Sequence, residues 1–221
     1  MKSDVVPCYL VCDLSLSMTD HIDHLNAGIR EFRGAAHADS SIGDRIRCCV
    51  VGFADTPRVL QPLQPLHPVD MLAELPEPGY CVGTNYGPVF THLRDAIDQD
   101  VRLLRAQRLC VGQPIVLFVS DGQPTDPVTW PAAFATLTDP NWADKPNVIA
   151  FGIGDADQDT LGRIGTFGIF LARDGVRIST ALIASMRSAP PDPVQAEHDL
   201  STSGPHVRRT LSGKGDAMEI H

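Results

Sequence analysis

Residues 7–17 read PCYLVCDLSLS, a short apolar run that ends on the acid Asp13 and continues as alternating leucines and serines. A continuous apolar run of this length is typical of a strand that is buried on both faces, as in a parallel sheet. Residues 46–53 (IRCCVVGF) repeat the apolar pattern, and residues 114–120 (PIVLFVS) repeat it directly before Asp121. The pattern predicts a parallel sheet with acidic side chains at the ends of its strands.

Helical segments separate these strands. Residues 21–38 carry apolar side chains at offsets of three and four, which places them on one helix face: Ile22, Leu25, Ile29 and Phe32. A second helix is expected to follow the Gly-bracketed loop of residues 83–88, because Pro88 suits a first helical turn. Shorter helices are expected over residues 130–137, 157–164 and 178–187, and shorter strands over residues 58–61, 147–153 and 167–172.

The alternation of strands and helices predicts the fold class. We expect an α/β domain with a doubly wound, Rossmann-like, mostly parallel sheet of about six strands and helices on both faces. One short antiparallel strand is expected at an edge. Residues 1–188 are assigned to this domain, whereas residues 189–221 are rich in Pro, Ser, Gly and charge and predict a disordered tail.

Composition narrows the classes of partner. The net charge of −9 disfavours nucleic acid, because phosphate backbones attract basic surfaces. No apolar stretch approaches the roughly 18–20 residues of a membrane span, and the N-terminus lacks the pattern of a signal peptide. The six cysteines form no C-x-x-C pair and most lie in apolar runs, so we expect buried thiols and a cytoplasmic protein.

Polar side chains from three segments are predicted to meet at one edge of the sheet. Asp13, Ser15 and Ser17 follow the first strand, Thr84 lies in the Gly-bracketed loop, and Asp121 follows the strand of residues 114–120. In open α/β sheets, ligands bind at the carboxyl ends of the strands. Carboxylates and hydroxyls suit a hard divalent cation, with Mg²⁺ expected first and Mn²⁺ or Ca²⁺ as alternatives. At most two protein charges leave this cation able to accept a carboxylate from a partner.

Together these pieces resemble a known family. D-x-S-x-S at residues 13–17, Gly-Thr at 83–84 and S-D-G at 120–122 are similar to the metal-ion-dependent adhesion site of the von Willebrand factor A (vWA) family. The resemblance covers roughly residues 5–188. It implies that the metal is held by Asp13, Ser15, Ser17, Thr84 and Asp121, and that the module binds a partner protein without catalysis.

Two longer phrases resemble one branch of that family. Residues 118–126 (FVSDGQPTD) and 148–157 (VIAFGIGDAD) are similar to the bacterial TerY-like branch, which is associated with tellurium resistance. The branch implies a cytosolic module of a bacterial stress or defence system that works beside protein kinases, phosphatases or TerD-type proteins. Leu16 departs from the family, which mostly has Gly there, although the integrin β branch accepts a bulky residue. We expect Leu16 to shape the rim of the site.

Other interpretations stay open at this stage. The serines after Asp13 could cap the next helix, and Leu16 could leave a structural module with a non-functional site. A Mg²⁺-dependent phosphohydrolase is less well supported, because such enzymes of the haloacid dehalogenase type need a second Asp where Ser15 stands. We expect Asp126 to order the loop after Asp121. Asp155, Asp157 and Asp159 are expected to be helix caps or solvated charges, since the Gly and Glu of a calcium loop are missing.

Overall fold

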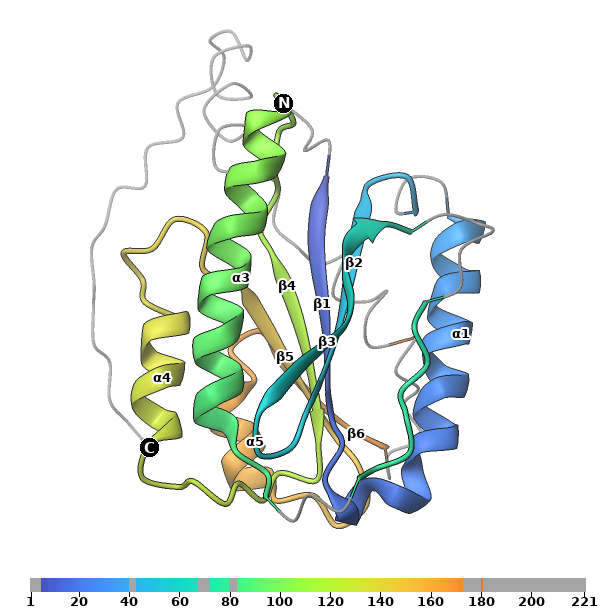
Figure 1. Cartoon of the computed structure of the whole chain (residues 1–221), viewed down its shortest axis with the longest axis vertical. Helices are drawn as coiled ribbons and strands as arrows, with labels where there is room; N and C mark the ends of the chain where they lie inside the picture. Colours follow the sequence, from blue (N-terminus) through green and yellow to red (C-terminus); the bar gives the residue numbers. More distant parts are fainter. Residues whose placement is uncertain (1–4, 40–42, 67–71, 80–82, 173–179, 181–221) are drawn as a thin grey trace, which may run out of the picture.

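The computed structural model describes residues 5–39, 43–66, 72–79, 83–172 and 180, which build a six-stranded sheet between two layers of helices (Figure 1). The strand order is β3-β2-β1-β4-β5-β6. Five strands are parallel: β1 (Val6–Asp13), β2 (Ile46–Phe53), β4 (Ile115–Ser120), β5 (Asn147–Gly152) and β6 (Gly168–Leu171). Edge strand β3 (Pro57–Pro65) runs antiparallel to β2. The predicted fold class is confirmed.

The helices divide between the two faces of the sheet. The short 3-10 helix η1 (Leu16–His21) leads from β1 into α1 (Ile22–Ala38), which covers one face. The opposite face carries α3 (Tyr86–Ala106) and α4 (Trp130–Leu137) in Figure 1, and the buried side chains of α5 (Gln158–Ile164) join the same core. The predicted helix of residues 178–187, apart from residue 180, and the predicted tail of residues 189–221 lie outside the described residues.

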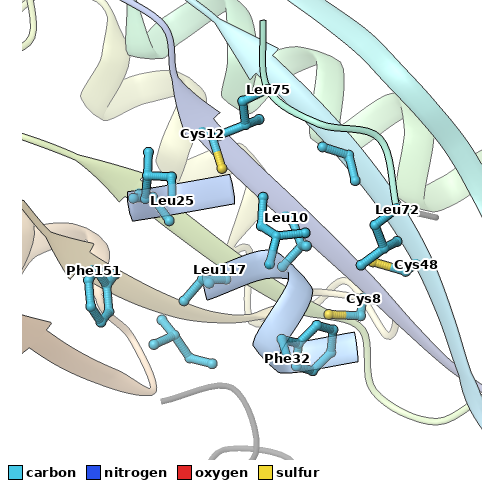
Figure 2. Close-up of a cluster of buried hydrophobic side chains, with 14 of the residues drawn as sticks. Cys8, Leu10, Cys12, Leu25, Phe32, Cys48, Leu72, Leu75, Leu117 and Phe151 are labelled. Carbon is cyan, nitrogen blue, oxygen red and sulfur yellow. The ribbon is translucent and has the colours of Figure 1, made fainter. Parts of the chain in front are cut away.

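Alternate residues of β1 feed two separate cores. Cys8, Leu10 and Cys12 face α1, where Figure 2 shows them among leucines and phenylalanines. Tyr9 and Val11 face α3. Among the described cysteines, Cys8, Cys12, Cys48 and Cys49 are buried thiols, as expected, and burial raises the pKa of the Cys12 thiol to about 12. Such a thiol stays protonated and unreactive at neutral pH. Cys81 lies outside the described residues.

Edge strand β3 is longer than the sequence indicated. The expected strand of residues 58–61 instead runs from Pro57 to Pro65 and contains three prolines, at 57, 62 and 65. Proline lacks a backbone N–H, which makes it unsuited to a central strand but acceptable on an edge strand. The pairing with β2 also shifts register near Val50, which accommodates the irregularity.

The strand order explains where a ligand site can form. From β1 the chain passes through α1 to β2 on one side, whereas β4 pairs with β1 on the other side. The carboxyl ends of β1 and β4 therefore meet where the strand order reverses, which is the place where open α/β sheets bind ligands. No helix in the part of the chain that the structure describes is both long and apolar enough to cross a bilayer.

The core beneath α3 depends on Phe118 of β4, which is fully buried. Its ring lies 4.8 Å from Tyr86, 5.1 Å from Phe53 and 5.2 Å from Phe90, measured between centroids. Phe118→Ala should lower the free energy of unfolding by about 3–5 kcal/mol in a urea titration, because it removes these contacts and leaves a cavity. Val128→Ala, at a side chain that is 87% exposed, should change it by less than about 0.5 kcal/mol. Equal effects of the two variants would contradict this packing.

Candidate metal centre

The centre is built on Asp13, the last residue of β1, whose side chain is fully buried. One carboxylate oxygen, Oδ1, accepts the backbone N–H of Ser15 at 2.8 Å. The other, Oδ2, accepts the hydroxyl of Ser120 at 2.7 Å, and Ser120 is the last residue of β4. A single carboxylate therefore joins the carboxyl ends of the two central strands.

A chain of hydroxyls continues from this carboxylate into α3. The Oγ atom of Ser120 lies 2.7 Å from the hydroxyl of Tyr86 and accepts the N–H of Gly122 at 3.1 Å. Because Ser120 has one proton and donates it to Asp13, the Tyr86 hydroxyl donates to Ser120. No role was predicted from the sequence for Ser120 or Tyr86. A polar residue at the end of a buried apolar run was the available signal for Ser120, and no local signal existed for Tyr86.

The surroundings of Asp13 would favour a positive charge beside its carboxylate. Burial raises the pKa of the Asp13 carboxyl, the hydrogen bonds from Ser120 and Ser15 lower it, and the charge of Asp121 raises it. Among the described residues, Asp13 forms no ion pair with Lys, Arg or His. A buried carboxylate without a counter-charge costs free energy, which a bound cation would offset. The donor set therefore fits a divalent cation.

The two serines present their hydroxyls together. The Oγ atoms of Ser15 and Ser17 lie 3.1 Å apart. Adjacent ligands of an octahedral Mg²⁺ ion, at 2.0–2.1 Å from the metal, lie about 2.9 Å apart. Ser15 is 2% exposed, whereas Ser17 and Leu16 are exposed on the first turn of η1. As expected, Leu16 stands on the rim, with 56% of its surface exposed.

Thr84 lies in the loop before α3, and Asp121 begins the loop after β4. Thr84 is 5% exposed, and its backbone N–H and carbonyl both bond to Thr125 in the loop after β4. Asp121 is partly exposed, and its Oδ1 atom accepts the N–H of Gln123 at 3.2 Å. The structure thus brings Asp13, Ser15 and Ser17 into one hydrogen-bonded group, with the negative charge of Asp121 close enough to act on Asp13.

Asp157 is a helix cap, as the sequence predicted. Its carboxylate accepts the N–H of Asp159 at 3.1 Å and the hydroxyl of Thr160 at 2.7 Å, at the start of α5. The hydrogen bond from Thr160 lowers the pKa of this carboxyl. The backbone N–H of Asp157 also bonds to the carbonyl of Asp121 at 2.9 Å. Asp157 therefore helps to hold the loop that begins at Asp121, one of the predicted metal ligands.

Several solved structures share the fold of this chain. The chain matches proximal thread matrix protein 1 from the mussel byssus, in a structure with a zinc-occupied MIDAS motif, at 18% identity and TM-score 0.57, over 84% of this chain and 48% of that chain. It matches a von Willebrand factor type A protein from Catenulispora acidiphila at 16% identity and TM-score 0.58, over 85% of this chain and 42% of the other. This chain has the von Willebrand factor A fold.

A bacterial pilus adhesin shares the same fold. SpaC from Lactobacillus rhamnosus GG, in its open conformation, matches with 13% identity and TM-score 0.58, over 85% of this chain and 30% of SpaC. The chain spans less than half the length of each of these three proteins. No family model and no curated protein sequence matches the chain. The likeness to these three proteins therefore concerns the vWA fold alone.

Ser120→Ala tests the hydrogen bonds that hold Asp13. The substitution leaves the Asp13 carboxylate, the Tyr86 hydroxyl and the Gly122 N–H without their shared partner. It should lower the free energy of unfolding by about 1–3 kcal/mol at pH 7 in EDTA, as measured by urea titration. Ser17→Ala, at an exposed position, should change it by less than about 0.5 kcal/mol.

The effect of Ser120→Ala should depend on pH. A folded-state pKa above the unfolded value means that the folded protein binds the Asp13 proton more tightly, so this stability is present at low pH and lost as the pH rises through the folded pKa. Loss of the Ser120 hydrogen bond raises that pKa further, and the deficit of the variant should therefore shrink as the pH is lowered from 7 toward 4. A deficit that grows on acidification would contradict this assignment.

Proposed function

We propose that the chain is a metal-ion-dependent protein-binding module whose cation, Mg²⁺ first and Mn²⁺ or Ca²⁺ as alternatives, is held by Asp13, Ser15, Ser17, Thr84 and Asp121. The observation that carries the proposal is the fully buried carboxylate of Asp13, which has no cationic partner among the described residues. A solved structure of the same fold has a zinc-occupied MIDAS motif, which supports a divalent cation at this place.

The distribution of charge and exposure supports binding of an acidic partner. The proposed ligands include only two carboxylates, those of Asp13 and Asp121, and the other ligands are neutral hydroxyls. The cation would therefore retain affinity for a further oxygen ligand. Asp13 and Ser15 are buried, whereas Ser17 and Leu16 face solvent. A partner would therefore approach the cation from the side of Ser17 and Leu16. An aspartate or glutamate of the partner would complete the coordination, and the exposed Leu16 would add an apolar contact.

Catalysis is not part of this proposal. The acid/base position of a haloacid dehalogenase-type phosphohydrolase is taken by Ser15, whose hydroxyl lies against Ser17. The carboxylate of Asp13 is engaged by Ser15 and Ser120 on its two oxygens. We therefore propose that the bound cation serves to recruit a partner protein.

The proposed setting is the bacterial cytoplasm, in a stress-response, tellurite-resistance or defence system. The support is the similarity of residues 118–126 and 148–157 to the TerY-like branch, which implies a protein kinase, a phosphatase or a TerD-type protein as the partner. The net charge of −9 disfavours nucleic acid as a partner. We propose no membrane partner.

Metal binding should stabilise the full-length chain against heat. A ligand of the folded state adds about 2.7 kcal/mol when its concentration is a hundredfold above its dissociation constant. The melting midpoint should therefore rise when EDTA is replaced by millimolar MgCl₂ or MnCl₂. Asp13→Ala and Thr84→Ala should abolish the rise. Thr138→Ala is the matched control, because it removes a threonine hydroxyl that donates to the carbonyl of Phe134 at the end of α4. This variant should keep the rise in the melting midpoint.

The outcomes separate the candidate functions. If the melting midpoint of the wild-type chain does not change with either metal, the result would favour a structural vWA module with a non-functional site. Binding through the cation would be contradicted if the wild-type chain showed the metal-dependent shift but Asp13→Ala still bound the same partner protein in a pull-down. The same preparations should leave p-nitrophenyl phosphate unhydrolysed, and hydrolysis that disappears in Asp13→Ala would instead make the chain a phosphohydrolase.

A further inference from the structure

The loop after Asp121 grips the loop that carries Thr84. The hydroxyl of Thr125 accepts the backbone N–H of Thr84 at 2.9 Å and donates to the side-chain carbonyl of Asn85 at 2.8 Å. The backbone N–H of Thr125 donates to the carbonyl of Thr84 at 2.9 Å. Three hydrogen bonds therefore run from one residue of the β4 loop to Thr84 and its neighbour.

Asp126 extends this grip to the start of α3. Its Oδ1 atom accepts the N–H of Tyr86 at 2.8 Å, and its Oδ2 atom accepts the N–H of Gly87 at 2.7 Å. These N–H groups have no acceptor within the helix, and a negative charge at this end is favoured by the helix dipole. A Cβ atom at residue 87 would lie 2.8 Å from Oδ2, so the close approach requires glycine. As expected from the sequence, Asp126 orders the loop.

The opposite side of the Thr84 loop is held by the β2–β3 turn. The N–H of Asn85 donates to the carbonyl of Ala54 at 2.8 Å, and its side-chain amide donates to the carbonyl of Asp55 at 3.3 Å. Gly83 lies so close to Asp55 that a Cβ atom there would come within 1.9 Å of the carboxylate. Thr84 is thus held through its neighbour Asn85 as well as through its own backbone.

We propose that Thr125 and Asp126 are positioning residues that make the centre selective for Mg²⁺ over Ca²⁺ by holding Thr84 at a fixed place relative to Asp121. The inference rests on the proposed metal site. Mg²⁺ requires near-ideal octahedral geometry at 2.0–2.1 Å, whereas Ca²⁺ accepts irregular shells at 2.3–2.6 Å. A ligand that cannot move by a few tenths of an ångström penalises the larger ion, and a ligand freed from its restraints loses that discrimination.

Asp121 and Thr125 belong to one short loop, so the loop that supplies one ligand also sets the place of another.

Isothermal titration of the full chain with MgCl₂ and with CaCl₂ tests the proposal. Thr125→Val removes the hydroxyl and its two hydrogen bonds at nearly constant volume, and Asp126→Asn replaces one of the two acceptor oxygens by an NH₂ donor. Each should weaken Mg²⁺ binding by about tenfold and Ca²⁺ binding by less than about threefold. Thr125→Ser retains the hydroxyl and should restore wild-type affinity for Mg²⁺. Asp139→Asn, at a partly buried loop aspartate that also accepts a backbone N–H, should bind both ions as wild type does.

The ratio of the two affinities decides the result. An unchanged ratio, with Mg²⁺ and Ca²⁺ weakened equally or left alone, would overturn the proposal and leave Thr125 and Asp126 with a structural role only. If Asp126→Asn fails to fold, Thr125→Val still gives the answer, because it leaves both bonds of Asp126 to α3 in place. A wild-type chain that binds neither ion would overturn the metal site itself, which is a distinct outcome.

Discussion

The hydrogen bond from Ser120 to the buried carboxylate of Asp13 is the interaction on which the rest of the site depends. It joins the ends of β1 and β4, the two strands at which the order of the sheet reverses. Among the described residues this carboxylate has no positive partner, and its burial, which raises the pKa of Asp13, disfavours the charged form. Sequences that keep such a local conflict usually do so at a functional site, as we propose for Asp13.

Rigid and open parts of the centre serve different purposes. Asp13 and Ser15 are fixed at the end of a central strand. The loop of Thr84 is held by hydrogen bonds to the loop after β4 and, through Asn85, to the β2–β3 turn. Ser17 and Leu16 instead stand exposed on the first turn of η1. Fixed inner ligands and an exposed rim suit a cation that exchanges an outer ligand with a partner. A closed shell of protein ligands would instead serve only the stability of the fold.

Much of this architecture could be predicted from the sequence. The apolar runs that end at Asp13 and before Asp121 were sufficient to place both acids at one edge of a parallel sheet, because continuous apolar runs of this length have few other uses. The extension of β3 to Pro65 was not predictable, since proline argues for a loop unless the strand is known to be an edge. The role of Tyr86 was missed because its partner, Ser120, is 34 residues away in the chain. The relation to the TerY-like branch stays a prediction from residues 118–126 and 148–157.

The central claim is that one divalent cation binds beside Asp13, and the paramagnetism of Mn²⁺ gives a direct measurement of it. Electron paramagnetic resonance of MnCl₂ titrated into the full chain should show loss of the free-ion signal with a stoichiometry of about one per chain, set by the single octahedral site. Mg²⁺ should restore the signal by competition, and Asp13→Ala should not bind. A free-ion signal that is unchanged by the wild-type chain, or equal binding by Asp13→Ala, would contradict the account.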